Sequence, residues 1–262
     1  MSASTITLLS LGTAAWIGTI AWAASMGMDL EAGTMGLGLP TFVGMWTLMM
    51  AAMMLPAVAP LVALYAKSVR SAPGPLAAFG AGYVLTWAAT GSVAFGLSSL
   101  FDRLAAGHPG VAHGVAVGVF AACGVYQLTP MKRRCLRHCR SPIGHLMHYA
   151  SYRGATRHLR AGAHHGVVCV GCCWTLMVVL IAVGVMNIPV MVGLALLITL
   201  EKQWKYGETL ANFAGVAALL FAIAIAFDAD LAPGLISRGG DMAMEMGRRE
   251  AGGAPGRPDG TT

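Results

Sequence analysis

The chain has 262 residues, of which 56% are hydrophobic and only 11% are charged, and its net charge is +6. Soluble globular domains carry about 25% charged residues, so this composition excludes an ordinary soluble domain and indicates a membrane protein. The N-terminal apolar run has no basic segment before it, which favours a retained span over a cleaved secretory signal.

Seven apolar segments are predicted to be helices, most of them near the ~20 residues that a membrane span needs. They are residues 5–25, 41–66, 76–100, 111–129, 166–187, 189–201 and 209–227. The predicted fold is therefore all-α, a polytopic transmembrane helix bundle of six to seven spans within residues 1–227. The sixth segment is short, so it either crosses the membrane or forms half of a re-entrant hairpin. Residues 228–262 end in a Gly- and Pro-rich sequence and predict a disordered polar tail.

The basic residues are unevenly distributed along the chain. Residues 131–165 contain eight of the 17 Lys and Arg residues and no acidic residue. Basic loops remain on the cytoplasmic side of a membrane, so this loop is predicted to be cytoplasmic in a multi-pass protein of the inner (plasma) membrane. Nucleic-acid binding could use such a loop, but topology explains it more simply, and we expect no nucleic-acid partner.

The second apolar segment, "MWTLMMAAMMLPAVAP", is unusually rich in methionine. Thioethers are soft ligands that suit Cu(I), although methionine also serves as flexible packing material, and the residues leave both interpretations open. Pro56 and Pro60 are expected to loosen this helix and free backbone carbonyls. The candidate ligands are Met45, Met49, Met50, Met53 and Met54.

A second candidate group lies at the start of the fifth segment, in "HHGVVCVGCCWTLMVVL". At helical spacing His165, Cys169, Cys172 and Cys173 share one face, which Met177 continues. Thiolates and imidazole are the usual ligands of zinc, and thiolates with thioethers are those of Cu(I). A single cysteine such as Cys123 is more simply a small buried hydrophobe, but three in five residues indicate a ligand set.

The third group follows the fourth segment, in "YQLTPMKRRCLRHCRSP". If the helix continues past Pro130, then Cys135, His138 and Cys139 share one face. This C-x-x-H-C pattern and the later C-x-x-C-C pattern lie at the two ends of the basic loop, on the same side of the membrane. We therefore expect the two groups to converge on one soft metal ion, copper as Cu(I) or alternatively zinc.

Other polar residues receive simpler interpretations. The pair Glu201-Lys202 is predicted to be a local interface pair at the end of the sixth segment. The remaining histidines of the basic loop are predicted to be solvated; they are His145, His148, His158 and His164.

Five motifs together resemble a bacterial family of predicted metal-binding integral membrane proteins, a domain-of-unknown-function family. The motifs are the methionine-rich and two cysteine-rich stretches with "GVMN" and "EKQWKYG", in the family's order across about residues 41–207. The resemblance implies an inner-membrane helical protein with copper as its metal, and a role in supplying copper to enzymes such as tyrosinases. It marks as functional the methionines of 45–54 and Cys135, Cys139, Cys169, Cys172 and Cys173.

The expected function is the handling or delivery of Cu(I), as chaperone or transporter. The expected partners are the metal ion, the lipid bilayer, and a copper enzyme or soluble copper carrier. A membrane thiol or copper-dependent oxidoreductase remains an alternative, although no thioredoxin-like motif or paired carboxylates support an enzyme. An assembly subunit stapled by zinc is the other alternative.

Overall fold

The computed structural model describes residues 3–25, 34 and 36–228, and all regular secondary structure within these ranges is helical. The helices are α1 (Ala3–Ser25), α2 (Leu39–Ser68), α3 (Pro73–Gly107), α4 (Pro109–Leu128), α5 (Pro130–Cys139), α6 (Pro142–Ala150), α7 (Arg157–Val183), α8 (Ile188–Gln203) and α9 (Gly207–Phe227). The prediction of an all-α bundle is confirmed, and each of the seven predicted segments is a helix.

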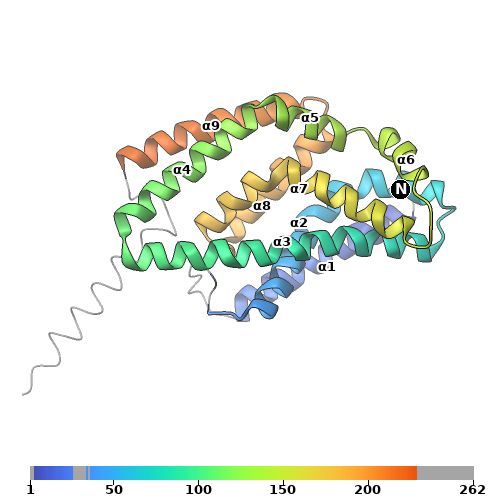
Figure 1. Ribbon diagram of the computed structural model, residues 1–262, viewed down its shortest axis with the longest axis horizontal. Coiled ribbons are helices and arrows are strands. Elements are labelled where there is room, and N and C mark those ends of the chain that lie inside the picture. Colours follow the sequence, from blue (N-terminus) through green and yellow to red (C-terminus); the bar gives the residue numbers. More distant parts are fainter. Residues whose placement is uncertain (1–2, 26–33, 35, 229–262) are drawn as a thin grey trace, which may run out of the picture.

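Six of the described helices are long and apolar enough to cross a membrane, namely α1, α2, α3, α4, α7 and α9. Helix α8 has 16 residues, roughly 24 Å at 1.5 Å per residue, and it is not among the six. Figure 1 shows α7 and α8 between the α4–α9 pair and α3; α2 packs along α3, and α1 packs along α2.

Contacts gather three of the helix connections at one end of the bundle. The Tyr65 hydroxyl lies 2.6 Å from His158 Nδ1, which joins the end of α2 to the start of α7. Gln203 at the end of α8 donates to the Pro56 carbonyl of α2 at 2.9 Å, and Arg140 after α5 donates to the Trp204 carbonyl. Helix α8 therefore returns toward the end of the bundle at which α7 begins.

Glycines allow α3 and α7 to pack very closely. A Cβ at Gly82 would collide with the Leu159 carbonyl oxygen, and one at Gly162 would collide with the Phe79 carbonyl oxygen. One turn farther along α7, a Cβ at Gly166 would lie 2.7 Å from Thr86 Cβ. Small residues that bring two backbones together are typical of helix contacts in membranes, where no hydrophobic force drives association. This contact fixes the position of α7, which carries the cysteine-rich stretch.

The basic loop contains the short helices α5 and α6 and the start of α7. Thr129 and Pro130 end α4 and start α5. The helix does not run uninterrupted past Pro130; α4 ends at Leu128, and α5 begins at Pro130. Thr129 is extended (ψ 152°), its side chain accepts from the Lys132 backbone N–H, and Pro130 occupies the first turn of α5, where proline is favoured. Cys135, His138 and Cys139 nevertheless remain on one helix.

Two prolines lie inside α2, which stays continuous through Ser68. Pro60 has no N–H to donate to the Pro56 carbonyl four residues earlier. Gln203 supplies the missing donor from α8. The freed carbonyl therefore holds the end of α8 against α2. In a membrane, a backbone carbonyl that proline leaves without its helical donor needs another hydrogen-bond partner.

The predicted tail, residues 228–262, lies outside the described residues apart from Asp228. The division into a bundle of residues 1–227 and a polar tail stays a prediction.

Gly82→Ala should destabilise the protein, because the added methyl group has no room against the Leu159 carbonyl. Overpacking of this kind costs about 1–3 kcal/mol, and we expect a lower thermal midpoint in detergent. Gly80→Ala is the matched control on the same helix, since its Cβ would meet nothing within 4 Å. Equal midpoints for the two variants would contradict the close α3–α7 contact.

Candidate metal centre

Two cysteines from separate helices meet where α5 crosses α7. Cys139 Sγ of α5 and Cys172 Sγ of α7 are 2.9 Å apart, although 33 positions separate them in sequence. Cys172 is buried and Cys139 is half-buried. The structure thus brings the two cysteine-rich stretches together, as their patterns predicted.

Cys169 lies one turn before Cys172 on α7 and contacts a cation. Lys202 Nζ of α8 donates to Cys169 Sγ at 2.9 Å, and the Tyr83 hydroxyl lies 3.2 Å from the same sulfur. An ammonium group beside a sulfur stabilises the thiolate form, which is the form that binds metals. Cys173 is also buried, and its Sγ donates to the Cys169 carbonyl.

Cys135 occupies a different place from Cys139. It is half-buried, and a Cβ built on Gly171 of α7 would lie 3.7 Å from its Sγ. Cys135 therefore packs beside the residue that precedes Cys172.

Three histidines form a row next to the cysteines. The ring of His138 on α5 lies 4.4 Å from that of His145 on α6, and the ring of His145 lies 4.9 Å from that of His165 on α7. His138 is exposed, while His145 and His165 are buried. Nε2 of His145 and Nδ1 of His165 have no hydrogen-bond partner among the described residues. Buried ring nitrogens without partners are available to a ligand.

The prediction that His145 is solvated is wrong. Helix α6 folds back over the bundle and leaves this residue only 1% exposed. Burial and the neighbouring His138 lower the pKa of His145 to about 4. The imidazole is therefore neutral at neutral pH, which is the form that coordinates metals.

The methionine stretch of α2 lies at the same depth as the cysteines of α7. Trp46 and Met177 line one cavity, and Val58 and His165 line another. Trp46 to Val58 on α2 and Met177 to His165 on α7 therefore run side by side in opposite chain directions. Each of these segments is roughly 18 Å long at 1.5 Å per residue. Four of the methionines fall between the two levels and Met45 lies one residue before the first; all five are at most 1% exposed, namely Met45, Met49, Met50, Met53 and Met54.

A buried ion pair holds α5 and α8 against the cysteine helix. Lys132 Nζ donates to Glu201 Oε2 at 2.7 Å, and both side chains are at most 2% exposed. The same ammonium donates to the Cys172 carbonyl at 2.7 Å, and Gln127 donates to Glu201 Oε1 at 3.0 Å. The predicted local pair of Glu201 with Lys202 is wrong, since Glu201 pairs with α5 and Lys202 pairs with Cys169.

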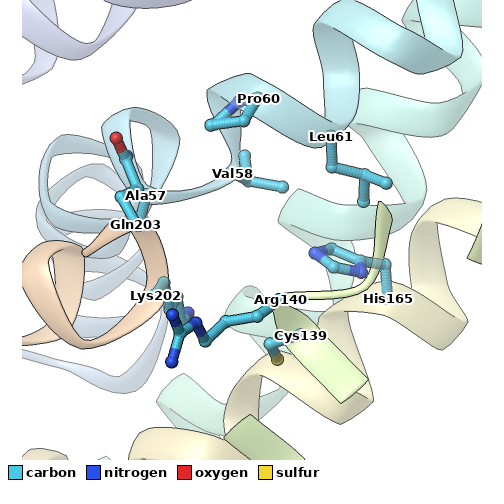
Figure 2. A pocket seen from close by; sticks show the side chains of 9 residues that line it. All are labelled: Ala57, Val58, Pro60, Leu61, Cys139, Arg140, His165, Lys202 and Gln203. Carbon is cyan, nitrogen blue, oxygen red and sulfur yellow. The ribbon is translucent and has the colours of Figure 1, made fainter. Parts of the chain in front are cut away.

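A cavity of about 290 Å³ opens beside this centre (Figure 2). Its lining comes from the proline-containing part of α2, from α7 and α8, and from the end of α5. The lining residues are Ala57, Val58, Pro60, Leu61, Cys139, Arg140, His165, Lys202 and Gln203. The cavity gives a direct approach to Cys139 and His165.

Sequence patterns predicted cysteines, methionines and two histidines as ligands, which stays a prediction, and they did not predict the groups that surround these residues. Within the described ranges, no three His, Cys, Asp or Glu side chains already stand around one point in a geometry that could hold a metal ion. His145, Lys132, Lys202 and Tyr83 reach the centre through tertiary contacts. The available signal was Glu201, an acid directly after the apolar segment 189–200; Lys132 begins the run Lys132-Arg133-Arg134 and gives no such signal.

Comparison with known protein families places most of this chain in a described family. A family model named PpoB2 and described as a copper chaperone matches residues 43–225, more than half of the chain. No curated protein and no solved structure matches.

Glu201→Gln should destabilise the fold strongly, because it leaves the buried Lys132 ammonium without a counter-charge. Removal of one partner of a buried pair costs about 3–5 kcal/mol, measurable as the free energy of unfolding in detergent. Glu208→Gln is the control, since Glu208 faces Arg137 at 3.6 Å on the surface, where such pairs contribute less than about 1 kcal/mol.

The double variant Lys132→Met/Glu201→Met should recover most of that loss, because it removes both charges together. A loss for Glu201→Gln no larger than that for Glu208→Gln would contradict the buried pair.

Proposed function

The chain belongs to the PpoB2 copper chaperone family, and we propose that it takes up Cu(I) at the cysteine centre and delivers it to a copper enzyme or a soluble copper carrier. The observation that carries this proposal is the 2.9 Å contact between Cys139 Sγ and Cys172 Sγ, which brings sulfurs of two different helices together. Cys169 and Cys173 are one turn or less away on the same buried face of α7.

The ligand chemistry favours Cu(I) over harder ions. Thiolates and thioethers select Cu(I), and the centre offers sulfur from cysteines with a stripe of buried methionines at the same depth. His145 and His165 add neutral imidazoles, which suit copper and zinc alike. Carboxylates, which hard cations prefer, are engaged elsewhere, since Glu201 is paired with Lys132.

The arrangement also suits release of the ion. Thiolates bind Cu(I) tightly, whereas the thioethers of Met49, Met53 and Met54 bind it weakly. An ion passed from the cysteines toward α2 would meet progressively weaker ligands and could leave. A chaperone needs this graded affinity, because a closed four-thiolate site would retain its metal.

The proposed location is the inner membrane. The six long apolar helices are compatible with a multi-pass membrane protein. The basic connections after α2, α4 and α8 gather at the end of the bundle where the cysteine centre lies, and basic loops stay cytoplasmic. We therefore place residues 131–165 and the entry to the centre on the cytoplasmic side.

Cys139→Ser and Cys172→Ser should each lower Cu(I) affinity by more than the roughly 10–100-fold that loss of an outer-shell partner costs. The measurement is competition with a chromophoric Cu(I) chelator on reduced, purified protein. Cys123→Ser is the control, because this buried cysteine lies on α4 beside Trp174 and Thr175, in a separate cavity.

Two results would contradict the proposal. One is unchanged Cu(I) affinity in both variants. The other is Zn²⁺ binding that outcompetes Cu(I) at the same cysteines, which would favour a structural zinc staple.

Replacing Met49, Met53 and Met54 together with leucine should slow Cu(I) transfer to an acceptor without changing the number of ions bound at the cysteines. Leucine conserves volume, so the fold should lose less than about 1.5 kcal/mol per site. The measurement is the rate of Cu(I) loss to excess chelator. A rate equal to that of the unaltered protein would show that these methionines serve packing alone.

A further inference from the structure

The cavity beside the cysteine centre is far larger than a single ion requires. Its volume is about 290 Å³, whereas a water molecule occupies about 30 Å³ of liquid. His165 lies on one side of it and Gln203 on the other, and Cys139 and Arg140 lie next to each other between them (Figure 2). The space fits a small organic molecule beside the sulfur of Cys139.

The described lining of this cavity is positively charged, whereas a bare Cu(I) ion would be attracted by a negatively charged one. Arg140 and Lys202 both line it, and none of the described lining residues is Asp or Glu. Arg140 Nη2 is held by the carbonyls of Trp204 and Lys205 at 2.7 and 3.2 Å. Carbonyls are neutral, so the guanidinium charge stays uncompensated, and it would repel an approaching Cu(I) ion.

We propose that the cavity receives copper as an anionic complex with a small thiol that carries carboxylate groups. The inference rests on the proposed function and names the form in which the cargo arrives. The planar fork of Arg140 matches a carboxylate. Lys202 lies in the same lining but already donates to Cys169 Sγ at 2.9 Å, so Arg140 is the group that would recognise the carboxylate. The copper of such a complex would then face Cys139 at the mouth and Cys172 behind it.

Transfer is a ligand exchange that leaves copper as Cu(I). Bonds from copper to the sulfurs of the small thiol break, and bonds to Cys139 Sγ and Cys172 Sγ form. Protons from the two protein thiols pass to the departing thiolates. No electron moves, so no oxidant or reductant is required.

The test compares the loading rates of three Cu(I) complexes of similar size, made with mercaptoacetate, mercaptoethanol and cysteamine. Their carboxylate, hydroxyl and ammonium groups make the complexes progressively less negative. Copper bound to the reduced protein after rapid desalting measures the rate. We expect the mercaptoacetate complex to load at least about tenfold faster than the cysteamine complex, as electrostatic steering allows.

Arg140→Gln should reduce this preference several-fold, while Arg140→Lys, which retains the charge, should keep the order of the three rates. Arg134→Gln is the matched control, because it removes the same charge from an exposed position on α5 outside the cavity. Rates that are equal for the three complexes, or equally altered by Arg134→Gln and Arg140→Gln, would overturn the inference. Failure of all three complexes to load the unaltered protein would instead overturn the proposed function.

Discussion

The geometry of the cysteine centre depends on the buried pair between Lys132 and Glu201. This pair connects α5 to α8, and its lysine also binds the backbone of α7 at the Cys172 carbonyl. A buried pair contributes little net stability, because removing both charges from water costs about as much as their attraction returns. The pair instead fixes the position of α5 relative to α7 and α8. With Lys132 fixed, Cys139 two turns later on α5 reaches the sulfur of Cys172.

A second constraint couples the methionine helix to the same centre. Pro60 leaves the Pro56 carbonyl without its helical donor, and Gln203 of α8 supplies the bond. The neighbouring Lys202 reaches Cys169. The end of α8 therefore touches both α2 and α7, and any movement of this short helix would change the access to the cysteines and the opening of the cavity together.

The sequence predicted the helices and the cysteine cluster because both follow from local periodicity. Cys169, Cys172 and Cys173 share a face by helical spacing alone, and all three are buried. The predictions for His145 and Glu201 were wrong because tertiary contacts determine the surroundings of these two residues. His145 was predicted to be solvated, but α6 packs its ring against His165. Glu201 was predicted to pair with the adjacent Lys202, but it pairs with Lys132, 69 positions away in sequence. Charge pattern along a chain gives the side of a membrane, but it does not give the partner of a buried charge.

The proposed centre requires that Cys139 and Cys172 bind the same copper ion. Copper K-edge X-ray absorption of the Cu(I)-loaded protein measures the ligands of that ion. We expect a sulfur coordination shell that loses one scatterer in Cys139→Ser and one in Cys172→Ser. A shell built of nitrogen or oxygen, or a sulfur shell unchanged in both variants, would contradict it.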